Sequence, residues 1–323
     1  VLQEAEDRSN PLLERVKFLG IFSSNMDELF KVRVASIHRR IELGKDHMHD
    51  VLDHIADNSR ELDERFRAVY QEIMTALEHE GIKIVTEADL ASFPGEVLTG
   101  LHSYFKDEVI THLVPIILSK DRSFPPLTDS NIYFGIVMSG EKPRYAVLEI
   151  PSHLPRFVTL SNGNFIYMDD VIRHYLNDLF YIFSYDSIAA YEFKISRDAE
   201  LDIDNDFSEG HVRKMERVLR QRKKGRPTRL VYDADMPPGL LKILMKELHI
   251  SEDDTLIPGG RYHNMKDLMR FPARKPELSF PKMDPVPHPV LDQCRAPLFE
   301  TVKRQDILVT YPYQSFDHLI RYL

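Results

Sequence analysis

The sequence has very little cysteine, with Cys294 as the one thiol among 323 residues. A single cysteine excludes an internal disulfide framework and any zinc site built from several thiolates. No apolar run approaches the roughly 18–20 residues of a membrane-spanning helix, and the first residues lack the pattern of a signal peptide. We therefore expect a soluble protein of the cytoplasm with no transmembrane segment.

Positive charge is also scarce, since 42 Lys and Arg stand against 51 Asp and Glu, giving a net charge of −9. An acidic chain is a poor candidate for non-specific nucleic-acid binding, so we expect no nucleic-acid partner. Local clusters can still bind a polyanion. The densest basic run is "RKMERVLRQRKKGRPTR", residues 213–229, which reads either as a solvated helix end with its loop or as a polyanion contact.

The first part of the chain has the pattern of a helical hairpin. Asn10 and Pro11 predict a helix start, with Asn as the cap, and the helix should run to about residue 43. A second helix is predicted over about 49–79, because its apolar residues recur at helical spacing. Residues 1–81 are therefore predicted to form a helical N-terminal domain.

The middle of the chain mixes strands and helices. Alternating apolar runs predict hairpins at 131–150 and 157–169, the second around an Asn-Gly turn. Asp169 or Asp170 should cap a helix over about 171–183, and strands are predicted at 187–197 and 229–235. The predicted fold class is α+β, with a mixed α/β head domain over 82–298 whose last residues, from 271, form a proline-rich linker.

The two ends of the sequence predict that the chain is a piece of a longer protein. Val1 is not an initiator Met and begins what looks like the end of a helix. The last residues, "QDILVTYPYQSFDHLIRYL", predict an apolar strand followed by the first turns of a helix. Residues 299–323 are therefore predicted to open a further domain.

The stretch "FLGIFSSNMDELFKVRVASIHRR", residues 18–40, combines helical apolar spacing with an inserted Ser-Ser-Asn. On a helical wheel the apolar residues cover most of the circumference, and Glu28, Lys31, Lys17 and Asp27 occupy the remaining third. Ser23 falls in the apolar stripe, where a small residue permits close helix packing. Asn25 lies one heptad after Phe18, and its amide is either a buried capping group or a reader of the edge of an adenine.

Two further patterns leave alternatives open, and a third is weak. Arg33, Arg39 and Arg40 either stabilise the helix end or face a phosphate. "PGGRYHN", residues 258–264, either cradles an anion with backbone N–H groups or forms a turn locked by its side chains. The alternating aspartates of 202–206 only superficially resemble a calcium loop, because the glycine and the terminal glutamate of an EF-hand are missing.

Taken together, these stretches resemble the polyphosphate kinase family. "SNPLLERVKFLGIFSSNMDELFKVRVA", "LIPGGRYHNMKDLMRFP" and "DILVTYPYQSFDHLIRYL" match in order and spacing, and so do "RYAVLEIP", "ISRDAELD" and "VYDADMP". The resemblance covers essentially the whole chain. It implies a helical N-terminal domain, a head domain that contributes to a homodimer or homotetramer, and the start of a phospholipase D-like C-terminal domain.

The same resemblance implies reversible transfer of the γ-phosphate of ATP to inorganic polyphosphate through a phosphohistidine. The family's phosphorylated histidine and its Mg²⁺-binding residues belong to the C-terminal half, so neither His263 nor His318 is expected to be the nucleophile. Asn25 matches the nucleotide-binding asparagine, and Phe18 matches an aromatic residue that packs on the adenine. The implied location is the cytoplasm, with peripheral association with the inner membrane as a variant.

A function of another class stays open beside this one. The matches could reflect a shared scaffold, in which case the chain would be a non-catalytic α/β interaction or dimerisation module. The two alternatives differ in what the parent reading frame encodes, because the kinase requires paired histidine segments in its C-terminal half.

Overall fold

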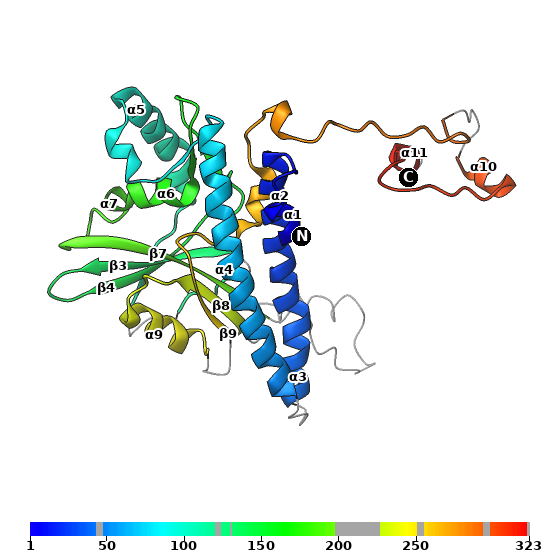
Figure 1. The fold of residues 1–323 in the computed structure, drawn as a ribbon. Helices are drawn as coiled ribbons and strands as arrows, with labels where there is room; N and C mark the ends of the chain where they lie inside the picture. The colour runs from blue at the N-terminus through cyan, green and yellow to red at the C-terminus, as the bar shows by residue number, and fades with distance from the viewer. Residues whose placement is uncertain are drawn as a thin grey trace. The chain divides into compact units, whose positions relative to one another are not determined.

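The computed structural model describes residues 1–42, 48–119, 124–129, 131–197, 227–250, 255–292 and 298–321. These residues form two compact units, Val1–Leu278 and Ser279–Leu323. The larger unit combines a helical hairpin with two sheets (Figure 1), which is the α+β class predicted from the sequence. The boundary between the units falls within the proline-rich stretch.

The helical hairpin is built from two long antiparallel segments. Its elements are α1 (Leu2–Glu6), α2 (Leu12–Glu28), the π-helical η1 (Leu29–Val34), α3 (Ala35–Glu42) and α4 (His49–His79). The predicted helices at 11–43 and 49–79 are therefore confirmed, with a π-helical interruption that begins at Leu29, three residues being left between it and the Ser-Ser-Asn stretch. The predicted cap is wrong, because the Asn10 amide donates to the Glu4 carbonyl at 2.9 Å, and Pro11 takes the N-cap position.

The rest of the larger unit alternates short helices with strands. The strands are β1 (Ile84–Val85), β2 (Ile116–Leu118), β3 (Ile132–Ser139), β4 (Arg144–Glu149), β5 (Phe157–Thr159), β6 (Phe165–Tyr167), β7 (Ser187–Arg197), β8 (Pro227–Asp233) and β9 (Thr255–Gly259). The helices are η3 (Asp89–Ser92), α5 (Gly95–Tyr104), η4 (Phe105–Val109), η5 (Ile110–His112), α6 (Met168–His174), α7 (Leu176–Leu179), α9 (Pro238–Glu247), η6 (Met265–Arg270) and η7 (Pro276–Leu278).

The strands form a six-stranded and a three-stranded sheet. The larger sheet has the order β2-β4-β3-β7-β8-β9 and is antiparallel except for the β8–β9 pair. The smaller has the order β1-β6-β5, with β1 parallel to β6. The predicted hairpins are confirmed as β3–β4 and β5–β6, the latter turning at Gly163 with a φ of +85°.

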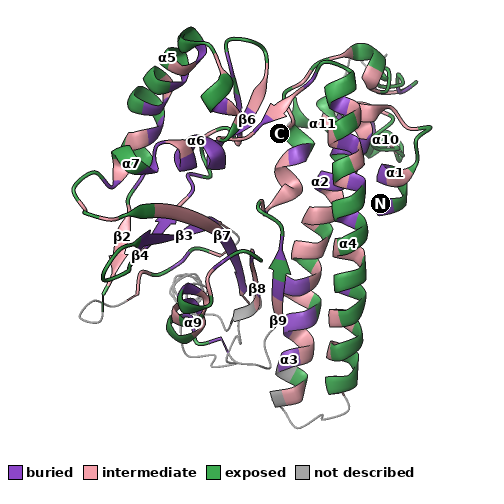
Figure 2. Ribbon diagram, turned by 60° about the vertical axis from the view of Figure 1, so that its left-hand side comes forward, coloured by how far each residue is buried: buried purple, intermediate pink, exposed green. Residues whose placement is uncertain are grey.

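Strand β3 is buried on both faces because helices cover both sides of the large sheet (Figure 2). Phe134 and Ile136 face a core shared with α5, α6 and α7, whereas Tyr133 and Val137 face a core shared with α9. At Gly135 a Cβ atom would lie 2.7 Å from the Leu240 side chain of α9. The glycine therefore sets how closely α9 packs on the sheet.

The predicted capping role of Asp169 and Asp170 is wrong. Helix α6 already begins at Met168, so both aspartates lie inside its first turn and are completely buried. Three other features named from the sequence lie outside the described residues: residues 213–226 of the basic run, the aspartates of 202–206, and Cys294.

The smaller unit contains α10 (Leu298–Arg304) and α11 (Asp317–Ile320). The strand predicted near 306–311 is wrong, since this stretch has no ladder partner within the described residues and Leu308 is 87% exposed. A strand needs a neighbour to satisfy its backbone groups. In the described part of the chain, none of the helices is both long and apolar enough to cross a membrane.

Candidate functional site

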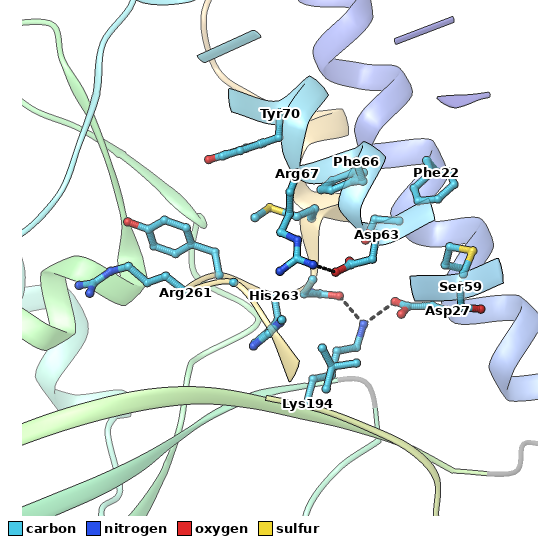
Figure 3. Close-up of a pocket in the computed structure, with 18 of the residues that line it drawn as sticks. Phe22, Asp27, Ser59, Asp63, Phe66, Arg67, Tyr70, Lys194, Arg261 and His263 are labelled. Carbon is cyan, nitrogen blue, oxygen red and sulfur yellow. Dashed lines mark hydrogen bonds and ion pairs between the residues drawn. The ribbon is translucent and has the colours of Figure 1, made fainter. Parts of the chain in front are cut away.

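A cavity of about 170 Å³ lies between the helical hairpin and the β9 edge of the large sheet (Figure 3). Helices α2 and α4 form one wall, and strands β7, β8 and β9 with the segment after them form the other. Its lining residues are Phe22, Ser23, Met26, Asp27, Ser59, Asp63, Phe66, Arg67, Tyr70, Lys194, Arg229, Val231, Gly259, Gly260, Arg261, Tyr262, His263, Asn264 and Met265.

An ion pair crosses the base of the cavity from α2 to β7. The Lys194 ammonium donates to an Asp27 carboxylate oxygen, and also to the Asn264 side-chain oxygen at 2.9 Å. Burial lowers the pKa of Lys194, and the Asp27 charge opposes this shift. The helical wheel places Asp27 in the charged third of the helix, yet its side chain is only 16% exposed, because α2 turns this residue towards the sheet.

Two arginines, one on each wall, add positive charge to the lining of the cavity. Arg229 lies 3.7 Å from Asp27 and places its guanidinium 4.4 Å from the ring centre of Phe30. Burial lowers the pKa of Arg229. On the other wall Arg67 pairs with Asp63 at 3.3 Å, while burial raises the pKa of that carboxyl.

Aromatic rings form the apolar side of the cavity. Phe22 of α2 stacks on Phe66 of α4 with 5.6 Å between the ring centres, and the ring centres of Phe66 and Tyr70 are 6.4 Å apart. The Tyr70 hydroxyl is 3.1 Å from that of Tyr167, and burial raises the pKa of Tyr70 to about 12. The cavity thus combines aromatic rings with cations, which suits planar or anionic ligands.

His263 lies in this wall but is only 6% exposed. Burial, helped by the charges of Lys194 and the nearby arginines, lowers the pKa of His263 to about 3, so the imidazole is neutral at physiological pH. Its backbone N–H donates to Glu192 at 2.9 Å. His263 lines the cavity, so the expectation that it is not the nucleophile stays a prediction.

The "PGGRYHN" segment is a strand end followed by locked side chains rather than an open turn. Pro258 and Gly259 belong to β9, and a Cβ atom at Gly259 would lie 2.7 Å from the His263 ring. Arg261 pairs with Glu87 and Asp170, and the Tyr262 hydroxyl donates to Asp170 at 2.5 Å. The structure therefore favours the second alternative, a segment fixed by its own side chains.

A network of buried charged side chains holds this segment in place. Arg156 binds Asp169 through two hydrogen bonds of 2.5 and 2.8 Å, and Arg173 bridges Asp170 and Glu192 at 2.8 and 3.1 Å. Burial, followed by the charge of Asp169, raises the pKa of Glu192 well above its usual range. Sequence reasoning missed the network, because its members come from α6, β7 and a loop and share no spacing.

The two residues predicted to bind ATP lie outside this cavity. Phe18 is half-buried and packs against the core of the helical hairpin, and Asn25 is exposed on α2. Arg33 and Arg40 are exposed, whereas the side chain of Arg39 is outside the described part. An exposed amide is available to a ligand, but it is not the buried capping group that one alternative required.

Within the described residues no three His, Cys, Asp or Glu side chains gather closely enough to hold a metal ion.

The chain matches two family models in sequence order. Residues 1–85 match the N-terminal domain of polyphosphate kinase, and residues 98–271 match its middle domain. Among curated proteins it is 35% identical over 340 residues to polyphosphate kinase of Escherichia coli K12, covering 100% of this chain and 49% of that protein. With polyphosphate kinase of Vibrio parahaemolyticus the identity is 37%, covering 99% of this chain and 48% of that protein.

The fold agrees with these matches. The crystal structure of polyphosphate kinase from Porphyromonas gingivalis superposes with a TM-score of 0.76 and 28% identity, covering 99% of this chain and 46% of that one. The chain therefore spans about half the length of the relatives it matches. Two domain models in order, full coverage of the chain and a common fold lead to one conclusion: the chain belongs to the polyphosphate kinase family.

Proposed function

We propose that this chain forms the N-terminal and head parts of a polyphosphate kinase, which reversibly transfers the γ-phosphate of ATP to inorganic polyphosphate. The observation that carries the proposal is the ordered match of both domain models, with 35% identity to a polyphosphate kinase across the whole chain. ATP, ADP and polyphosphate are then the partners. Two steps follow: a histidine attacks the γ-phosphorus and releases ADP, and a terminal polyphosphate oxygen attacks the phosphohistidine.

The phosphohistidine and the Mg²⁺ ligands are proposed to belong to the part of the parent enzyme beyond this chain. This is supported by the coverage, since the chain spans about half the length of the polyphosphate kinases it matches. The contribution of this chain is then binding and orientation. We assign it recognition of the base, because Asn25 presents an exposed amide on the same helix as the half-buried ring of Phe18.

An amide can pair with the edge of adenine through its carbonyl and its NH₂ group, and a ring can pack on the base face. Asn25 and Phe18 are two helical turns apart along α2, so they lie on the same side of the helix. Neither group touches the reacting phosphate. Both should therefore change the affinity for ATP more than the chemical step.

Self-association is the second part of this proposal, as a homodimer or homotetramer through the head domain over 82–298. Tyr181 and Ile182, after α7, are 80% and 69% exposed, and Val114 is 69% exposed. Large apolar side chains at the surface are suited to an interface between subunits. The cytoplasm remains the proposed location, with peripheral inner-membrane association as a variant.

The proposal is tested by comparing this chain with its full-length parent. Both are incubated with γ-labelled ATP and Mg²⁺, and acid-labile phosphohistidine is trapped. The parent should become labelled and the 323-residue chain should not. Stoichiometric labelling of this chain would refute the location of the nucleophile, and an unlabelled parent would favour the non-catalytic interaction module.

A further inference from the structure

We propose that Lys194 and Asn264 are positioning residues for ATP binding, which hold the Asn25-bearing helix in place through Asp27. This inference rests on the proposed function of Asn25. Asp27 follows Asn25 by two residues, which is about 200° around a helix. The two side chains therefore leave α2 on opposite sides, and the burial agrees: Asn25 is exposed, while Asp27 is half-buried and faces Lys194 (Figure 3).

The clamp on Asp27 has two members, Lys194 and Asn264, and its cation is buried. Lys194 of β7 contacts the Asp27 carboxylate and the Asn264 oxygen, and its side chain is 4% exposed. Charge-assisted hydrogen bonds away from solvent are stronger and more directional than surface pairs. A small rotation of α2 would separate these groups, so the clamp fixes the rotation of the helix and with it the direction of Asn25.

Asn264 is held in an unusual backbone conformation at the point of contact. Its φ is +59°, in the left-handed region that asparagine tolerates better than most residues. The Asn264 amide also lies 3.4 Å from Asp267, at the start of η6. Strained positions of this kind persist where the surroundings fix them, and they concentrate at functional sites.

A second contact fixes the same helix further towards its N-terminus. A Cβ atom at Gly20 would lie 2.7 Å from both the backbone N and the side chain of Met269, so α2 and η6 touch backbone to backbone. Beyond Asp27 the helix changes to the π-helical η1, a form that is rare and often found beside functional sites. Asn25 thus lies between a close-packed contact and a change of helical form.

The anchor of the clamp is the buried network of the head region. The His263 N–H donates to Glu192, the Arg173 guanidinium donates to the Arg261 carbonyl at 3.2 Å, and Arg156 lies 3.3 Å from Asp267. These bonds hold the residues on both sides of Asn264. The "PGGRYHNMKDLMRFP" segment then fixes the position of α2, which carries Asn25, relative to the large sheet.

The test is a double-mutant cycle in the full-length parent enzyme. Lys194→Met should raise KM for ATP roughly three- to tenfold, with kcat within about twofold and KM for polyphosphate unchanged. In an Asn25→Ala background the same change should raise KM for ATP less than twofold, because the clamp acts through Asn25. Lys83→Met, which breaks the exposed Lys83–Glu78 pair of 3.0 Å, is the matched control and should change nothing.

A second variant covers the case in which Lys194→Met does not fold. In Lys194→Met the Asp27 carboxylate keeps, among the described residues, the Arg229 contact of 3.7 Å. Asn264→Gly keeps the backbone conformation available and removes the side chain that accepts from Lys194, so it should show the same coupling to Asn25→Ala. If Lys194→Met and Asn264→Gly raise KM equally in both backgrounds, or not at all, the positioning role is refuted.

The outcomes separate this inference from the proposed function. An increase of KM in Asn25→Ala without coupling to either variant overturns the clamp and leaves base recognition intact. An unchanged KM in Asn25→Ala overturns both. A parent that makes no polyphosphate contradicts the proposed function itself.

Discussion

Arg156 of the buried network is predicted to contribute more to stability than a surface arginine does, and Arg156→Met tests this. Its guanidinium binds the Asp169 carboxylate with two hydrogen bonds, contacts Asp267 at 3.3 Å and donates to the His263 carbonyl at 3.2 Å. The side chains of Arg156 and Asp169 are 9% and 0% exposed. Methionine fills similar volume but leaves the Asp169 charge buried without this partner.

The magnitude follows from that burial. Removal of one partner from a buried ion pair costs about 3–5 kcal/mol, because the remaining charge loses its compensation. In a unit of this size, such a loss lowers the melting temperature by on the order of 10 °C. The surface pair between Arg65 and Glu6, with an N–O distance of 2.9 Å, is the matched control. Arg65→Met should cost less than about 1 kcal/mol, because both side chains reach solvent.

The assay is urea denaturation of this chain, with thermal melting in parallel. The double variant Arg156→Met/Asp169→Asn should recover part of the loss, because it removes the uncompensated charge as well. Equal destabilisation by Arg156→Met and Arg65→Met would refute the argument. The argument would also be refuted if the double variant were less stable than Arg156→Met by as much as Asp169→Asn alone destabilises the wild-type chain.

Three further outcomes are expected. Asn25→Ala in the parent enzyme should raise KM for ATP about tenfold, the loss of one or two hydrogen bonds, and weaken the choice of ATP over GTP; a lower melting temperature with unchanged KM would make Asn25 a packing residue. Burial raises the pKa of Asp170 from 3.8 to about 6, so its contribution to stability is full below pH 3.8 and is lost as the pH rises through 6. The wild-type chain should therefore lose stability relative to Asp170→Asn between pH 4 and 6, and denaturation curves with a constant difference would contradict this. Sedimentation at micromolar concentration should show dimers or tetramers of this chain, and a monomer throughout would count against self-association through the head domain.

The regular parts of the fold were predictable because their signals are local. Helical spacing identified α4 with its bounds, and alternation with an Asn-Gly turn identified the hairpin β5–β6. The missing strand near residue 308 shows the limit, since a strand depends on a partner as well as on its own residues. The predicted helix caps at Asn10 and Asp169 were wrong because these side chains bond to residues away from the expected helix start. Asn10 donates to the Glu4 carbonyl, and Asp169 accepts from Arg156.

The candidate site was less predictable than the fold. The sequence indicated Asn25 and "PGGRYHN" as candidate sites. Neither stretch predicts the hydrogen bond from Lys194 to Asp27, which are 167 residues apart in the chain. Long-range pairs between side chains depend on how elements pack, and a single sequence carries little trace of that packing. The buried arginines of the network look, in the sequence, like ordinary surface charges.

The most direct test of the central claim is the reverse reaction of the full-length parent. The purified protein is incubated with ADP, Mg²⁺ and long-chain polyphosphate, and ATP formation is followed together with the loss of polyphosphate. A polyphosphate kinase should form one ATP for each phosphate removed from the chain, and the reaction should stop when ADP is omitted. Loss of polyphosphate without ATP, or no reaction under conditions where the protein is folded, would contradict the account.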